Sequence, residues 1–466
     1  MEKALPKFLI AWLPAWMVVT GMPPRLAAAS SVKTFPATAA IPYVPTRHDT
    51  VRDLLWLADV HTNDVVYDLG SGDGRIVIAA VRDFGARRAV GIEAASRLVE
   101  ESCEQAVRAG VADRVQFILG DLFTNALSAA SVVVLFLGHE ANLELRAQLV
   151  RSLKPGTRVV SHQFNMGEWT PDKVLDVRTV YLGMYSTRVM GFEHNPEVPD
   201  FQGHESGRDH DVLAAWLVPA PVAGTWRGKV RVDSEEREFR LTLHQRLSTA
   251  TGSFALQGPT NLQGPVEVDM WGGHLRCWCI PTNRAWYVSQ MWFEGHATGD
   301  TLNGSLWVPQ GKETRQCNWV GHREPADLTG TWEWPGPSNS PVQLKLERRD
   351  GRLAASYVDP SRATPYNPAE GRPIPVHDFY DCGGGFYFTL LLGLEGNSLR
   401  NGSRRVGPED GWLVGEAVAQ DGTLTGTIGF YPYANPFLGP GHTGQADGGF
   451  AVQANRRDWR PKRVGP

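Results

Sequence analysis

The sequence lacks several features that would place it at once in a familiar class of proteins. It has no long low-complexity tract, and its 46 basic residues nearly balance its 50 acidic residues, for a net charge of −4. A chain without a basic excess offers no general attraction for phosphate backbones or anionic membranes. The composition therefore argues against a nucleic-acid-binding protein and is typical of a globular one, with 42% hydrophobic and 21% charged residues.

Cysteine is scarce, with five residues in the chain. No C-x-x-C pair is present, which argues against a structural zinc site, and we expect no bound metal. Cys277 and Cys279 lie two residues apart, on one face of a predicted strand. Cys317 is a plausible disulfide partner for them in an oxidising compartment. Free buried thiols are the alternative interpretation.

The sequence has no apolar run suited to a permanent membrane anchor, because the stretch 8–22 is short and is interrupted by Pro14. Two lysines precede this stretch and three alanines follow it, which is the order of a secretory signal cleaved after Ala29. We therefore expect residues 1–29 to be a signal peptide and the protein to be periplasmic or secreted. A start codon placed too early, with Met17 or Met22 as the true start, would instead leave it cytoplasmic.

The length predicts two or three domains. From residue 46 to about 219 helix-like and strand-like segments alternate, which predicts a Rossmann-like α/β domain over 41–220, with a mostly parallel sheet covered by helices on both faces. The predicted helices are 48–60, 74–85, 96–110 and 142–153, and the predicted strands are 65–70, 88–93, 115–123, 131–138, 157–164 and 212–219.

The alternation stops after residue 180, and 181–211 carries proline, glycine, histidine and aspartate with little periodicity. We interpret this stretch as an insertion in the α/β domain. Its potential metal ligands include no helix-spaced pair, so a polar loop is favoured over a metal site. These residues are His194, His204, Glu205, Asp209, His210 and Asp211.

Short strands and turns fill the rest of the chain. The stretches 223–230 and 328–335 both contain Gly-Thr-Trp, and each is followed by an alternating strand. We predict two diverged all-β units, barrels or sandwiches, over 221–325 and 326–460. The first contains Trp271, Trp278, Trp286, Trp292 and Trp307, for which we favour core positions over an exposed platform that stacks sugars or peptides.

A glycine-rich loop follows the first strand of the α/β domain, in the sequence YDLGSGDGR. Glycine at positions 70, 72 and 74 permits a tight turn from strand to helix and lets a ligand approach the backbone. Asp68 ends the strand just before this loop. Its carboxylate would repel a pyrophosphate but suits a cofactor that carries a cationic amino-acid group.

This loop resembles motif I of class I S-adenosylmethionine-dependent methyltransferases. The resemblance implies S-adenosyl-L-methionine as the cofactor, with Glu93 at the end of the second strand on the ribose hydroxyls and Asp121 on the adenine amino group. A nicotinamide site would explain Glu93 but neither the glycine spacing nor Asp121. The implied cofactor-binding residues are Tyr43, Thr46, Asp68, Gly70, Ser71, Gly72, Gly74, Glu93, Asp121 and Leu122.

The segments 42–46 (PYVPT) and 145–172 narrow the resemblance to a bacterial subgroup related to the family with sequence similarity 173. Members of that family are small protein-lysine methyltransferases, so the resemblance, which covers about residues 41–220, implies a protein substrate and transfer to a lysine amine. It also implies that Tyr43 and Thr46 shape the methionine end of the cofactor site.

A lysine acceptor must be neutral to react, so we looked for an acid or base where the family presents the methyl group, just after the fourth strand. His139, Glu140 and Asn142 occupy that position. For His162 we favour a satisfied core histidine. The alternative function is an exported binding protein whose β units bind a sugar or peptide and whose methyltransferase fold is an inactive scaffold.

Overall fold

The computed structural model describes residues 41–179, 185–191, 210–232, 235–258, 262–279, 291–310, 313–335, 341–349, 351–359, 373–376, 378–392, 411–432 and 456–465. The predicted signal peptide and most of the predicted insertion, with His194, His204, Glu205 and Asp209, lie outside these residues. So does Trp286.

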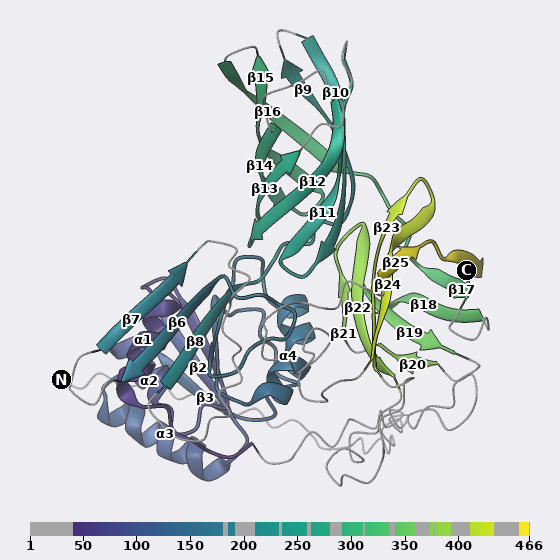
Figure 1. Ribbon diagram of the computed structural model, residues 1–466. Coiled ribbons are helices and arrows are strands. Elements are labelled where there is room, and N and C mark those ends of the chain that lie inside the picture. Colours follow the sequence, from purple (N-terminus) through teal and green to yellow (C-terminus); the bar gives the residue numbers. More distant parts are fainter. Residues whose placement is uncertain are drawn as a thin grey trace, which may run out of the picture. The chain divides into compact units, whose positions relative to one another are not determined.

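Five parallel strands form the centre of the first sheet (Figure 1). They pair in the spatial order β3 (Val115–Leu119), β2 (Arg88–Glu93), β1 (Val65–Leu69), β4 (Val132–Leu135), β5 (Arg158–His162). The chain therefore changes its winding direction between β1 and β4. In open α/β sheets ligands bind beyond the carboxyl ends of the strands at such a switch point.

Four helices accompany this sheet, and their positions agree with the predicted ones within a few residues. They are α1 (His48–Leu57), α2 (Arg75–Arg82), α3 (Ser96–Arg108) and α4 (His139–Ser152). α1 and α2 share a hydrophobic core with Val66, Val134 and Val160. Successive strand residues point to opposite faces, and Ser161 accordingly meets Asn142 of α4 on the other face. The expectation of helices on both faces is confirmed.

The far side of the sheet differs from the prediction. β8 (His210–Leu217) pairs antiparallel with β5, and β6 (Lys173–Thr179) and β7 (Tyr185–Gly191) extend the sheet beyond it, also antiparallel. The expectation of an irregular stretch from residue 181 is therefore wrong for β7. As the last strand of the sheet, β7 is held by backbone pairing to one neighbour, which needs no regular apolar pattern.

The first β unit is a closed barrel of eight antiparallel strands, each paired with the next, and β16 pairs with β9 to close it (Figure 1). The strands are β9 (Gly224–Val232), β10 (Glu235–Arg246), β11 (Thr249–Leu256), β12 (Leu262–Trp271), β13 (His274–Cys279), β14 (Met291–Thr298), β15 (Thr301–Gln310) and β16 (Glu313–Arg323).

The second β unit consists of two five-stranded sheets that share one hydrophobic core. One has the order β20 (Ile374–Pro375), β19 (Arg352–Val358), β18 (Pro341–Arg349), β17 (Gly330–Pro335), β26 (Lys462–Gly465), and the other β21 (Asp378–Asp381), β22 (Gly385–Leu392), β23 (Gly411–Gln420), β24 (Thr423–Pro432), β25 (Arg456–Trp459).

The two β units begin in the same way. The indole N–H of Trp226 donates to the carbonyl of Val222, four residues earlier, and Trp332 does the same to Leu328. In each unit the last strand also places a guanidinium over this indole, Arg323 over Trp226 and Arg463 over Trp332. The repeated Gly-Thr-Trp thus marks one local structure used twice, although the first unit closes into a barrel and the second does not.

Residues Pro42–Pro466 form one compact unit, so the boundaries near residues 220 and 325 stay predictions. Among the helices in the described ranges, none combines the length and the apolar character needed to span a bilayer.

Candidate active site

The glycine loop lies between β1 and α2, at the carboxyl edge of the sheet. Gly70, Gly72 and Gly74 all have positive φ, at 80°, 53° and 80°, a region that glycine enters without strain. At Gly72 a Cβ atom would lie 2.5 Å from the ring of Tyr43, so this glycine also permits a close approach. The loop is drawn against β2, because Gly70 N and Ser71 N both donate to Ile92 O.

Asp68 lies under this loop and is 2% exposed. Its Oδ2 atom is buried without a hydrogen-bond partner in the described part of the chain. Burial, with the nearby charges of Glu93 and Asp73, raises the pKa of Asp68 to about 8. The carboxyl group is thus held mostly protonated at neutral pH, and a cationic ligand group beside it would favour its ionised form.

Glu93 ends β2 and faces the same loop. Its Oε2 accepts a hydrogen bond from Gly72 N at 3.0 Å, and its Oε1 accepts from Ala94 N and Ala95 N at 2.9 and 3.0 Å. Three backbone donors fix the carboxylate at the strand end. An ionised carboxylate offers further acceptor sites, so Glu93 fits the predicted role of holding two hydroxyl groups.

Tyr43 and Thr46 belong to the segment that precedes α1. Arg75, the first residue of α2, donates to Thr46 O at 2.7 Å and forms an ion pair with Asp73 at 2.6 Å. Burial, followed by the charge of Asp73, raises the pKa of Tyr43. Arg75 therefore ties the segment with PYVPT to the glycine loop, which places both predicted residues beside the loop.

Asp121 and Leu122 follow β3, at the same edge of the sheet. Asp121 is exposed, and its Oδ1 accepts a hydrogen bond from Phe123 N at 2.9 Å. Its backbone carbonyl accepts from Asn125 Nδ2 at 2.5 Å, which fixes the turn. The acid is available to a ligand that spans the ends of β1, β2 and β3.

Unpartnered buried polar atoms gather at this edge and support a ligand there. Within the described residues they include Asp68 Oδ2, Ser71 Oγ, Asn142 Oδ1 and His162 Nδ1. Leaving a buried polar atom unpaired costs about 1–3 kcal/mol, so a cluster of such atoms indicates a missing polar ligand. S-adenosylmethionine carries an ammonium group, hydroxyls and an adenine amine, which match the acids of this edge.

The three candidate catalytic residues lie on α4. The helix begins at His139, three residues earlier than predicted, because Gly138 at φ 107° ends the turn after β4. Asn142 is fully buried, and its amide donates to Ser161 Oγ and to Phe164 O, both at 3.0 Å. Asn142 thereby holds the loop after β5. The side chain of Glu140 lies outside the described residues.

Sequence reasoning missed the surroundings of His162. Its Nε2 lies 3.2 Å from Asp211 Oδ1, and Asp211 Oδ2 accepts from Thr50 Oγ1 at 2.6 Å. Burial raises the pKa of Asp211, but the hydrogen bonds from His162 and Thr50 outweigh it and lower this pKa overall. The His162 ring also lies 4.0 Å from that of Phe136. His162 is thus held by a buried acid, which the 49 intervening residues hide in the sequence.

No other described cluster offers an equivalent site. Groups of three or more His, Cys, Asp or Glu side chains able to hold a metal are absent from the described ranges. All five cysteines are free thiols, and Phe293 and Leu306 separate Cys277 from Cys317 across the barrel wall. The disulfide interpretation is therefore wrong in this structure, and the alternative of free buried thiols holds for the three barrel cysteines.

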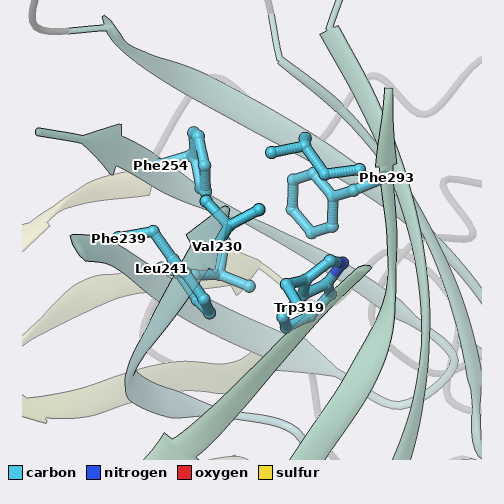
Figure 2. Close-up of a pocket in the computed structure, with 7 residues that line it drawn as sticks. Val230, Phe239, Leu241, Phe254, Phe293 and Trp319 are labelled. Carbon is cyan, nitrogen blue, oxygen red and sulfur yellow. The ribbon is translucent and has the colours of Figure 1, made fainter. Parts of the chain in front are cut away.

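The interior of the barrel is a packed core. Its pocket is lined by Val230, Phe239, Leu241, Phe254, Phe293, Leu306 and Trp319, most of them drawn in Figure 2. A cavity volume of about 10 Å³ leaves room for about one water molecule. With apolar walls and so little space, the interior stabilises the fold rather than binding a large ligand.

The tryptophans that we predicted as core lie elsewhere. Trp278, Trp292 and Trp307 are paired across three strands, and each alternates with an inward-facing residue, so they lie on the outer face of the barrel. Trp292 and Trp307 stack with their ring centroids 3.8 Å apart. Trp271 is partly buried beneath Arg276. The alternating pattern was correct, but it does not say which face is inside.

Comparison with known proteins yields a match over this domain. Residues 68–173 match the family model of the ANTKMT methyltransferase domain. A protein-lysine N-methyltransferase of Saccharolobus islandicus is 43% identical over 148 residues, which cover 30% of this chain and 92% of that protein. A human lysine N-methyltransferase named for ATP synthase is 36% identical over 134 residues, 29% of this chain and 56% of that one.

Among solved structures, an RNA methyltransferase from Salinibacter ruber in complex with S-adenosyl-L-homocysteine is 42% identical. The match covers 38% of this chain and 94% of that one, with a TM-score of 0.30. The chain thus spans nearly the whole of the archaeal and Salinibacter proteins and about half of the human one.

Proposed function

We propose that this chain, which belongs to the class I S-adenosylmethionine-dependent methyltransferases in the subgroup related to the family with sequence similarity 173, transfers a methyl group to a lysine amine of a protein. The observation that carries the reaction is the acidic carboxyl edge, where buried Asp68 lacks a partner under the glycine loop. The lysine acceptor is supported by the names of the archaeal and vertebrate relatives.

The chemistry asks little covalent help from the protein. When bound, the cofactor supplies an electrophilic methyl group on a sulfonium sulfur. The nitrogen lone pair forms the new N–C bond as the C–S bond breaks, the electrons stay on sulfur, and the amine releases one proton. The protein must orient the acceptor in line, exclude water and favour the neutral amine. Phe136 and Leu137, directly after β4, supply apolar surface at this position.

We propose the residues after β4 and β5 as the acceptor side of the site. His139, at the first position of α4, remains a candidate to accept the proton, with Glu140 beside it. Asn142 acts instead by holding the loop after β5, because its amide is committed to Ser161 and Phe164 and has no basic nitrogen. His162, oriented by Asp211, is a further candidate.

The experiment that tests the function follows isotope-labelled methyl groups from S-adenosylmethionine into separate protein and RNA fractions of the source cells. Label in protein, recovered as methyl-lysine after hydrolysis and absent with Asp68→Asn, is the expected result. Label in RNA alone would replace the lysine acceptor. The net charge of −4 argues against that outcome, because phosphate binding relies on basic surface.

We also propose, from the N-terminal pattern alone, that the protein is exported. The expected mature protein begins at Ser30 and is found in an extracytoplasmic fraction. N-terminal sequencing of the native protein from separated cell fractions tests this. A cytoplasmic protein that starts at Met17 or Met22 would refute it.

A further inference from the structure

Two charged residues of the methyltransferase domain are buried against the β units. Arg146 lies on α4, one turn after Asn142, and is 4% exposed. Glu168 lies in the loop that joins β5 to β6, and its side chain is 5% exposed. A charge is seldom buried unless it is paired, so the partners of these two residues reveal what the burial is for.

Arg146 joins the loop after β5 to the second β unit. Its Nη1 donates to Met166 O and its Nε donates to the hydroxyl of Tyr380, each at 2.9 Å. Its Nη2 forms an ion pair with Asp378, which also accepts from the hydroxyls of Tyr380 and Thr389. Burial alone would lower the pKa of Arg146, but Asp378 and Tyr380 raise it well above its usual value.

Glu168 joins the same loop to both β units. Arg246 of the barrel strand β10 pairs with it at 2.5 Å, and the hydroxyl of Tyr387 from β22 donates to it. The guanidinium of Arg246 also lies over the ring of Tyr387, 5.6 Å from its centroid. The loop is therefore gripped at Met166 and at Glu168 by residues that come after position 220.

The conformation of this loop depends on such support. Gln163 has a φ of 69°, which is unusual for a residue other than glycine, and exchanges hydrogen bonds with Val212. Gly167 has a φ of 62°, and a Cβ there would lie 2.9 Å from the Nη1 atom of Arg146. The backbone at Gly167 is thus fitted closely around the guanidinium.

The loop lies where the acceptor must enter. It follows β5 at the carboxyl edge of the sheet, next to the turn after β4, and Asn142 holds its carbonyl at Phe164. The archaeal relative is matched over 92% of its length by 148 residues of this chain, so it has no room for counterparts of both β units. The grip on the loop is an addition specific to the longer chain.

We propose that the second β unit fixes the loop 163–169 on the acceptor side through Arg146, so that Arg146, Asp378 and Tyr380 are positioning residues of the methyl-transfer site. The term acceptor side rests on the proposed function. The β units then form part of the enzyme's own machinery instead of a separate ligand-binding module attached to an inactive scaffold.

The test uses the full chain with the double substitution Arg146→Met/Asp378→Asn, which removes both charges together and avoids stranding one in the interior. Amide hydrogen exchange of residues 163–169, measured without ligand, is expected to become at least about tenfold faster, because the loop loses its contact at Met166. Calorimetric titration with S-adenosylhomocysteine is expected to give an affinity within about twofold of the wild type, because the glycine loop is untouched. Tyr380→Phe, a milder change, is expected to accelerate loop exchange by about threefold.

The matched control is Arg158→Met/Asp64→Asn, which removes another buried ion pair of the same domain at the opposite end of β5. It is expected to lower the unfolding midpoint and to leave loop exchange unchanged. Unchanged loop exchange in both the double variant and Tyr380→Phe, or equal acceleration in the control, would overturn the proposal. Failure of the wild type to bind S-adenosylhomocysteine would refute the proposed function, and the ligand-free exchange measurement would still decide the inference.

Discussion

The carboxyl edge of β1, β4 and β5 and the interior of the barrel are both built from buried side chains, but they treat polar atoms differently. At the edge, Asp68, Ser71, Asn142 and His162 each leave a polar atom unpartnered within the described residues. Among the described core residues of the barrel only the Trp319 indole nitrogen does so. The edge holds a cost that a ligand can remove, whereas the barrel interior contributes to stability alone.

The largest expected effect breaks the comparison on the barrel side. Trp319→Ala opens a cavity in a core that is already full and should lower the free energy of unfolding by about 3–5 kcal/mol. Chemical denaturation followed by circular dichroism measures this. Trp292→Ala, on the outer face, is the control and should cost clearly less. If the folded Trp319→Ala protein lost its affinity for S-adenosylhomocysteine, the separation of the two regions would fail.

The second prediction concerns the edge. Asp68→Asn should weaken S-adenosylhomocysteine binding by about 1.5–3 kcal/mol, or roughly 10- to 100-fold, because a charge-assisted hydrogen bond to the ligand's ammonium group is lost. Calorimetric titration gives the affinity. Asp269→Asn makes the same chemical change on the exposed face of β12 and should have no effect. Equal affinities for the wild type and Asp68→Asn would mean that the cofactor site is misplaced.

The third prediction is a pH dependence that only the edge should show. The folded protein without ligand keeps a proton on Asp68 up to a pKa of about 8, whereas the unfolded chain releases it near 3.8. Stability from this group is therefore present at low pH and is lost as pH rises from about 4 to 8, by at most about 1.4 kcal/mol per pH unit.

Ligand binding should respond in the opposite direction. An ammonium group beside Asp68 favours the ionised acid, so the affinity for S-adenosylhomocysteine should rise by up to about tenfold per pH unit until about pH 8. Unfolding and calorimetric titrations at several pH values measure both slopes. In Asp68→Asn both should flatten, and slopes that persist in this variant would assign them to another group.

The smallest expected effect sharpens the description of the barrel. Burial raises the pKa of Cys277 well above its usual value and that of Cys279 to about 11, so neither thiol should react in the native state. A thiol reagent should label the exposed Cys103 first and the other cysteines only after denaturation. Rapid labelling of Cys277 would show that the barrel opens, and an oxidation-dependent unfolding midpoint would restore the disulfide hypothesis.

The part of the site that is local in sequence was predictable from it. Asp68 and the three glycines lie within seven residues, and a tight turn from strand to helix allows few alternatives to glycine. Glu93 and Asp121 followed from their places at the ends of neighbouring strands. For each of these positions, chain order and the geometry of a parallel sheet were sufficient.

The contacts that join distant segments were not predictable in this way. Arg146 reads as a polar residue on an amphipathic helix, and its partner Asp378 is 232 residues away. Trp278 and Trp292 alternate correctly, but period-two alternation does not say which face of a strand is inside. Burial beside another part of the fold decided the role of each of these residues.

The closed barrel has a consequence for the order in which it forms. Seven of its eight strand pairs join neighbours along the chain, whereas the pair β16–β9 joins Trp319 to Val230 across almost the whole unit. Hairpins of neighbouring strands close quickly, and the long loop makes the seam the slow step. The stack of Arg323 on Trp226 lies at that seam. Weakening it should therefore speed unfolding and hardly change the rate of folding.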